Sequence, residues 1–224
     1  MPELMLEEAA GRLLHWYGQH GRKFPWRKTQ DPYKILISEV LLQKTQAETV
    51  EKFYERFLRV YPTFEKLSSS ELSEVEDFIK PLGLAYRARR LVAIAKEIQT
   101  KYGGAVPNSI EHLLTLHGVG YYMAQAVLCF AFDQPITLVD VNVMRILARA
   151  FGISSETEAR RILTSMLPKD RFKDFNWALI DLGAAICTPR NPRHSECPID
   201  YICKKYPIDP KKWRFLRKKR PNVI

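Results

Sequence analysis

The sequence lacks any apolar stretch long enough to cross a bilayer. Its longest uninterrupted apolar run, "AVLCFAF", covers only Ala126 to Phe132, whereas a membrane-spanning helix needs roughly 20 such residues. The first residues, "MPELMLEEAAGR", are acidic where a secretory signal has a basic start followed by an apolar block. We therefore expect a cytoplasmic protein that is neither exported nor bound to a membrane.

Strand signals are nearly absent as well, and there is no internal repeat or low-complexity linker. Helical periodicity runs through the chain, which predicts an all-α fold. One buried helix is expected from Asp31 to Pro62, with Asp31 as its N-cap and Pro32 at its first position. Further helices are expected over residues 69–83, 85–104, 109–118, 120–133, 141–152 and 156–168.

Cysteine is scarce, and three of the four cysteines fall in one short stretch, "CTPRNPRHSECPIDYIC". The spacing is Cys187-x6-His194-x2-Cys197-x5-Cys203. Cysteines of an intracellular protein in such a pattern are more often metal ligands than disulfides. Three Cys and one His form a complete tetrahedral set for zinc, and compact Cys-rich sites also hold iron–sulfur clusters. The residues alone leave both metals open.

Acidic residues are outnumbered, with 25 Asp and Glu against 35 Lys and Arg and a net charge of +10. This excess favours a polyanionic partner, of which nucleic acid is the first candidate. In "LHGVGYYMAQAVL", Gly118 and Gly120 separate two expected helices. Backbone N–H groups at the start of the second helix can hold a phosphate. An ordinary turn between helices is the alternative.

Two carboxylates, Asp140 and Glu39, are candidate catalytic groups. Asp140 directly precedes an expected helix, so it is a helix cap, a group kept ionised to face a developing cation, or both. Glu39 lies among apolar neighbours in "ILISEVLLQKTQ". It is either exposed on a helix face or partly desolvated with a raised pKa, as a general acid requires.

The motifs, in their order and spacing, resemble the helix-hairpin-helix DNA glycosylases of the endonuclease III and adenine glycosylase type. The resemblance rests on "FPWRKTQDPYKILISEVLLQKTQ", "LHGVGYYMAQAVL", "LVDVNVMRILARAFG" and "DLGAAICTPRNPRHSECPIDYIC". It implies a six-helix domain over 32–135 and a cluster-containing domain made from 1–31 and 136–224, with the active site in the cleft between them. The implied partner is double-stranded DNA with a mismatched or damaged base, bound by a monomer at the nucleoid.

The resemblance also implies roles for single residues. Asp140 matches the aspartate that stabilises the oxocarbenium-like sugar and helps water attack C1′, and Glu39 matches a glutamate that assists departure of the base. Tyr122 occupies the position of the lysine nucleophile of bifunctional members, and a phenol cannot form a Schiff base. We therefore expect weak or no lyase activity at abasic sites.

DNA contacts are implied at four positions. Gly118 and Gly120 match the hairpin glycines. Lys44 falls where family members insert a side chain into the duplex, and Asn142 falls near the substrate backbone. Plain surface roles are the alternative for Lys44 and Asn142.

The branch of the family is indicated by the positions at which this sequence differs from the motifs of the other branches. Glu39, Tyr122 and "VDVN" look most like the thymine-DNA mismatch glycosylases, which remove thymine or uracil opposite guanine. Adenine glycosylases carry Tyr-Tyr where this chain has Leu84 and Ala85. An adenine DNA glycosylase acting on A opposite G or 8-oxoguanine is the enzymatic alternative. A DNA-binding module without catalysis is the other.

The family pattern at the cysteines is Cys-x6-Cys-x2-Cys-x5-Cys holding a [4Fe-4S] cluster. Here the second ligand position is His194. Imidazole can ligate iron, so the resemblance implies a cluster held by Cys187, His194, Cys197 and Cys203. Zinc or a loop without metal is the alternative.

Overall fold

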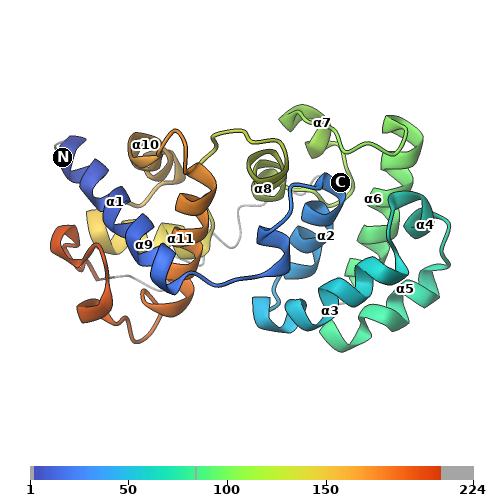
Figure 1. Ribbon diagram of the computed structural model, residues 1–224, viewed down its shortest axis with the longest axis horizontal. Helices are drawn as coiled ribbons and strands as arrows, with labels where there is room; N and C mark the ends of the chain where they lie inside the picture. The colour runs from blue at the N-terminus through green and yellow to red at the C-terminus, as the bar shows by residue number, and fades with distance from the viewer. Residues whose placement is uncertain (1–2, 84, 208–224) are drawn as a thin grey trace. The chain divides into compact units, whose positions relative to one another are not determined.

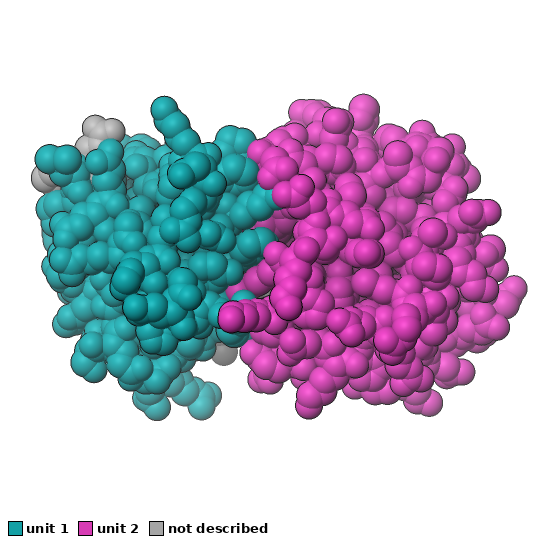
Figure 2. Space-filling view, viewed as in Figure 1, with its two compact units in different colours: residues 1–22, 135–224 teal, residues 23–134 magenta. Residues whose placement is uncertain are grey.

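The computed structural model describes residues 3–83 and 85–207, and within these ranges the chain forms α-helices and short 3-10 helices and no strand. The all-α prediction is confirmed. The chain divides into two compact units, one made of residues 1–22 and 135–224 and the other of residues 23–134 (Figure 2). None of the described helices is both long and apolar enough to span a membrane.

The unit of residues 23–134 holds the helices that carry Glu39, Lys44, the paired glycines and Tyr122. Its α4 and α5 pack on α6, and α8 packs on α2 and α7 (Figure 1). The helices are α2 (Pro32–Leu42), α3 (Ala47–Val60), α4 (Phe64–Ser68), α5 (Leu72–Ile79), α6 (Tyr86–Tyr102), α7 (Ile110–Leu114) and α8 (Tyr121–Ala131), with 3-10 turns at Pro25–Arg27 and Lys80–Leu82.

This unit begins at Lys23, whereas the resemblance implied a start at Pro32. The reason is aromatic packing ahead of α2. Phe24 stacks on Trp26 with ring centroids 4.7 Å apart, and Trp26 meets the ring of Tyr54 edge-on at 5.3 Å. Both Phe24 and Trp26 are buried, so the segment before Pro32 belongs to this core.

The expected helix from Asp31 to Pro62 is broken into α2 and α3, so that prediction was wrong. Its start is as expected, because the Asp31 carboxylate accepts the backbone N–H of Tyr33 at 2.9 Å. The break comes at Lys44, whose φ of 55° lies in the left-handed region that an α-helix does not allow. Residues 43–46, which we call the insertion turn, connect the two helices.

The unit formed by both chain ends contains α1 (Glu3–His20), α9 (Val141–Phe151), α10 (Glu156–Met166) and α11 (Phe172–Ala185), followed by 3-10 turns at His194–Glu196 and Asp200–Ile202. In it α11 packs on α1 and α9 (Figure 1). The buried carboxylate of Asp181 accepts the Arg22 side chain at 2.7 Å and its backbone N–H at 2.9 Å. This pair ties the N-terminal segment to α11. Ile199 and Ile202 join the same apolar core and anchor the cysteine-rich segment.

Candidate active site and metal centre

Asp140 is the N-cap of α9. One carboxylate oxygen accepts the backbone N–H groups of Asn142 at 2.8 Å and Val143 at 2.7 Å. The other accepts the side-chain amide of Asn142 at 2.9 Å. Both expected roles of Asp140 are therefore compatible, since capping uses one oxygen and Asn142 orients the other.

Burial and the helix N-terminus act in opposite directions on the pKa of Asp140. We expected the helix N-terminus to keep the carboxylate ionised. Burial is the largest influence and raises the pKa of Asp140 above its ordinary value. The N–H groups of Val143 and Asn142 and the charge of Arg145 act in the opposite direction.

Hydrogen bonds run without a gap from Asp140 to the first cysteine of the metal segment. Asn142 donates to Asp140 and accepts from the Nη1 group of Arg145 at 2.9 Å. Arg145 is buried, and its Nε group donates to the carbonyl of Cys187 at 2.8 Å while Nη2 donates to that of Gly183 at 2.7 Å. The orientation of Asp140 therefore depends on where the Cys187 backbone is held.

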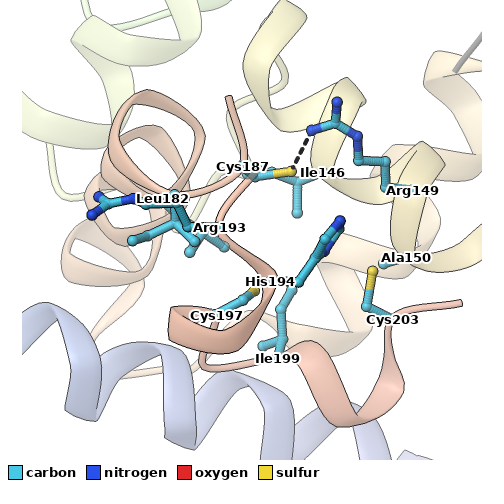
Figure 3. A pocket seen from close by; sticks show the side chains of 11 residues that line it. Ile146, Arg149, Ala150, Leu182, Cys187, Arg193, His194, Cys197, Ile199 and Cys203 are labelled. Carbon is cyan, nitrogen blue, oxygen red and sulfur yellow. Dashed lines mark hydrogen bonds between the residues drawn. The ribbon is translucent and has the colours of Figure 1, made fainter. Parts of the chain in front are cut away.

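A second buried arginine of α9 holds the same loop. Arg149 donates from Nη1 to the Cys187 sulfur at 3.3 Å and to the carbonyl of Thr188 at 2.7 Å (Figure 3). Its Nη2 group donates to the carbonyl of Pro189 at 3.0 Å. The loop therefore receives a positive charge beside a sulfur that would be anionic when it ligates a metal.

All four predicted metal ligands line one pocket, whose empty space, with the solvent at its mouth included, is about 320 Å³. Figure 3 shows Cys187, His194, Cys197 and Cys203 around it. Local backbone bonds place them: Cys197 donates its N–H to the carbonyl of His194 at 3.0 Å, and Cys203 donates to that of Asp200 at 3.1 Å. The sequence prediction that these residues share one site agrees with this placement.

A single zinc ion needs its ligands close around one point. Zinc takes sulfur ligands at about 2.3 Å and nitrogen ligands at about 2.0–2.1 Å. Within the described residues, no three His, Cys, Asp or Glu side chains are grouped closely enough to hold one metal ion.

The chemistry of the donors also fits a metal centre. Burial raises the pKa of the Cys197 thiol to about 11 and raises that of Cys203 as well. Buried thiols without a cation stay protonated, and coordination to a metal removes the proton. Arg149, a buried cation, donates to the Cys187 sulfur.

The paired glycines form the turn between α7 and α8. Gly118 has a φ of 71°, which favours glycine, and Gly120 is the N-cap of α8. A side chain at Gly120 would meet no atom within 4 Å, so the backbone there is open to an approaching group. The hairpin predicted from sequence is present.

Glu39 and Tyr122 belong to the unit of residues 23–134, whereas Asp140 belongs to the unit formed by both chain ends. Glu39 lies on α2 and Tyr122 on α8, two helices that pack together, and both residues are half-buried. Lys44 is exposed in the insertion turn. Leu84, one of the two residues that separated this chain from the adenine glycosylases, lies outside the described residues.

Sequence reasoning missed Arg145 and Arg149. The signal was available: two arginines four residues apart in "VNVMRILARAF" share a face of an otherwise apolar helix. Buried charges at such a spacing need partners, and here the partners are backbone carbonyls of the cysteine-rich loop.

The chain is similar to known DNA repair proteins. Residues 37–169 match the HhH-GPD superfamily base excision DNA repair proteins, and residues 187–203 match the iron–sulfur binding domain of endonuclease III. It is 42% identical to a thymine-DNA glycosylase of Aeropyrum pernix over 91% of this chain and 96% of that protein. A thymine/uracil-DNA glycosylase of Methanothermobacter thermautotrophicus is 37% identical over 87% of this chain and 91% of that protein.

Solved structures agree with these sequence matches. The structure of a thermostable thymine-DNA glycosylase superposes with a TM-score of 0.85 at 35% identity, covering 91% of this chain and 97% of that one. The family match extends over more than half of the sequence, and the fold, the hairpin and the iron–sulfur segment all agree with it. The chain therefore belongs to the HhH-GPD superfamily and is a DNA glycosylase of base excision repair.

Proposed function

We propose that this protein is a monofunctional DNA glycosylase that hydrolyses the N-glycosidic bond of mismatched thymine or uracil opposite guanine. The observation that carries the proposal is the Asp140 carboxylate, held at a helix N-terminus by the side chain of Asn142. It occurs in a chain whose near full-length relatives are thymine- and uracil-DNA glycosylases. The proposed partner is double-stranded DNA, bound by a monomer in the cytoplasm at the nucleoid.

Asp140 faces the sugar in this mechanism. As the base leaves, positive charge develops at C1′ and the ring oxygen, and a fixed carboxylate stabilises that charge more than it stabilises the neutral substrate. The carboxylate must be ionised for this role. The N–H groups of Asn142 and Val143 and the charge of Arg145 favour the ionised form against the effect of burial. Asp140 also orients the water that attacks C1′ after the base has left.

Glu39 and Tyr122 complete the proposed chemistry. Glu39 delivers a proton to the departing base, a role that suits a half-buried carboxyl group with buried neighbours on its helix. Tyr122, at the second position of α8, contacts the extruded nucleotide. Extrusion costs least for a mispaired base, so a mismatch is the substrate that this mechanism favours.

The hairpin and the insertion turn bind the duplex. Backbone N–H groups after Gly120 hold one phosphate, which positions the DNA without reading its sequence. Lys44 enters the duplex from the insertion turn, and Asn142 contacts the backbone beside the sugar. The net charge of +10 attracts the polyanion over longer range.

Cys187, His194, Cys197 and Cys203 would hold a [4Fe-4S] cluster. The cluster would fix the conformation of the cysteine-rich segment, which has few buried apolar residues of its own. Folding of this segment places the Cys187 carbonyl, to which Arg145 donates. Arg190, Arg193, Lys204 and Lys205 would then be presented to DNA phosphates.

A panel of duplexes tests the proposal. Single-turnover excision is measured on T:G, U:G, A:G and A:8-oxoguanine duplexes of one sequence, with T:A as the matched control. We expect abasic product from T:G and U:G and none from T:A. Excision of adenine instead would make the protein an adenine glycosylase, and binding without any abasic product would make it a DNA-binding module.

Lyase activity is expected to be weak or absent. A lyase of this class forms a Schiff base between an amine and C1′, and the phenol of Tyr122 cannot do so. Borohydride added during reaction with abasic DNA should therefore trap no covalent adduct. An adduct formed in good yield would show that a lysine elsewhere in the chain acts as the nucleophile.

The role of His194 can be tested through metal content. His194→Ala should lose most iron and sulfide and the visible absorbance, because one corner of the cluster loses its ligand. His194→Cys should retain all three, because it restores the four-cysteine pattern. Ser195→Ala is the matched control in the same exposed turn. Full iron and sulfide in His194→Ala would exclude the histidine as a ligand.

A further inference from the structure

We propose that Arg90 is a positioning residue that holds the insertion turn and the hairpin at a fixed spacing, so that the hairpin anchors DNA while the turn enters it. The inference rests on the proposed function. Arg90 lies on α6, which is part of neither the insertion turn nor the hairpin. It was not among the residues predicted from sequence, and it is half-buried in the structure.

The first contact joins Arg90 to the insertion turn. Its Nη1 group donates to the side-chain carbonyl of Gln43, the C-cap residue that follows α2. Gln43 directly precedes Lys44, whose left-handed backbone is unfavourable for a residue with a side chain. The hydrogen bond from Arg90 to Gln43 therefore helps to stabilise a turn in which Lys44 adopts an unfavourable backbone conformation.

The second contact joins Arg90 to the hairpin. The guanidinium lies directly against Gly118, because a Cβ atom added there would stand 2.7 Å from Cζ of Arg90. Real Cβ contacts are essentially never that short, so a side chain at position 118 would displace the Arg90 guanidinium from its present position. The same guanidinium lies over the ring of Tyr86 at 5.4 Å. Its plane is thus fixed between the ring, the hairpin and Gln43.

Other residues of α6 hold the two elements separately. Arg87, which is fully buried, donates to Thr45 at 2.9 Å and to the Leu41 carbonyl on the turn side, and to the carbonyls of Leu82 and Gly83 at 2.8 Å. Glu97 accepts the backbone N–H of His117 in the hairpin at 2.7 Å. Arg90, placed between Arg87 and Glu97 along α6, contacts both elements.

The contacts predict which step of the reaction depends on Arg90. A residue that binds phosphate contributes to affinity for any duplex and to the salt dependence of binding. The guanidinium of Arg90 is committed to Gln43 and to the surface of Gly118. Its loss should leave attraction to undamaged DNA in place and impair extrusion of the base, because the turn is then no longer set against the anchored strand.

The test uses the full-length protein and three readouts. Arg90→Ala is compared with Arg89→Ala, the neighbouring arginine that is exposed and pairs with Glu76 at 3.3 Å. The readouts are affinity for an undamaged duplex as a function of salt, fluorescence of 2-aminopurine beside a U:G mismatch as a measure of unstacking, and the single-turnover rate on U:G. Thermal unfolding of each variant is recorded first.

We expect Arg90→Ala to lower both unstacking and the single-turnover rate by about tenfold, the range of a coupling between contacting residues. Duplex affinity and its salt slope should stay near those of the wild type, as should all readouts of Arg89→Ala. Gln43→Ala removes the other partner of the contact and should lower unstacking and the single-turnover rate to the same extent. The double variant Arg90→Ala, Gln43→Ala should be no worse than either single variant. If Arg90→Ala does not fold, Gln43→Ala carries the test.

Arg90→Lys separates positioning from charge. A lysine keeps the charge and lacks the planar fork, so it should not rescue unstacking. Full rescue by lysine, a loss of about one unit in the salt slope, or additive defects of Arg90→Ala and Gln43→Ala would overturn the inference. If the wild type excises no base from any duplex, the proposed function fails, while the unstacking comparison still decides the role of Arg90.

Discussion

Replacing Asp140 by asparagine is expected to lower the single-turnover rate of excision by about 100- to 1,000-fold, the usual effect of removing one preorganised electrostatic group. The variant keeps an oxygen for the N–H groups of Asn142 and Val143, and asparagine is as good an N-cap as aspartate. Helix α9 should therefore remain folded. The amide lacks the negative charge that faces the sugar, so binding to a mismatched duplex should survive while excision does not.

One local cost accompanies this substitution. The second oxygen of Asp140 accepts the Asn142 amide at 2.9 Å, and an Nδ2 group in its place would set donor against donor. The loss of that hydrogen bond should reduce stability by about 1 kcal/mol. Stability is therefore measured beside the rate, at a temperature where the variant is fully folded.

Ser155→Ala is the matched control for Asp140→Asn. Ser155 caps α10 in the same unit, and its hydroxyl accepts the N–H of Glu158 at 3.2 Å. Its loss should cost about 1 kcal/mol of stability and leave excision unchanged. Near-wild-type excision by Asp140→Asn, or an equal loss of activity in Ser155→Ala, would contradict the assigned role.

Arg145→Met is expected to reduce the free energy of unfolding by about 2–5 kcal/mol, because it strips donors from buried carbonyl groups. The carbonyls of Cys187 and Gly183 would lose their bonds from the side chain, and Asn142 would lose the group that fixes its amide. Methionine fills much of the same volume, so the loss reports hydrogen bonding more than packing. We expect excision to fall about tenfold even where the variant is folded, since Asn142 no longer orients Asp140.

Arg161→Met provides the comparison, because Arg161 is an exposed arginine on α10. Its stability and activity should stay near those of the wild type. Thermal unfolding and single-turnover rates are measured for both variants. Unchanged excision by a folded Arg145→Met protein would show that the chain of hydrogen bonds from Cys187 to Asp140 has no bearing on catalysis.

Local sequence signals predicted the capping and turning residues. Asp31 and Asp140 precede helices, and the pair Gly118 and Gly120 separates two helices. Helix capping and a tight turn each depend only on residues that are close together in the chain. The resemblance added the family and the roles. Helices α1 and α11 were not predicted; α11 begins after Arg171, whose side chain makes no capping hydrogen bond that would mark its start.

The remaining features depend on contacts between distant parts of the chain. The break between α2 and α3 needs Arg87, which reaches the Thr45 hydroxyl from α6. The early start of the unit that begins at Lys23 needs Trp26 to meet Tyr54. Arg145 and Arg149 acquire their roles only when the Cys187 loop folds back over α9. Periodicity within one helix does not contain this information.

The most direct test of the central claim is the identity of the base released from a T:G or U:G duplex. The protein is incubated in excess with a duplex of each kind, the small molecules are separated, and the free base is identified by mass, with the strand examined for breaks. We expect free thymine or uracil, an abasic site opposite guanine and an intact strand. Release of adenine from A:G and A:8-oxoguanine duplexes with no thymine or uracil, or no released base from any duplex, would contradict it.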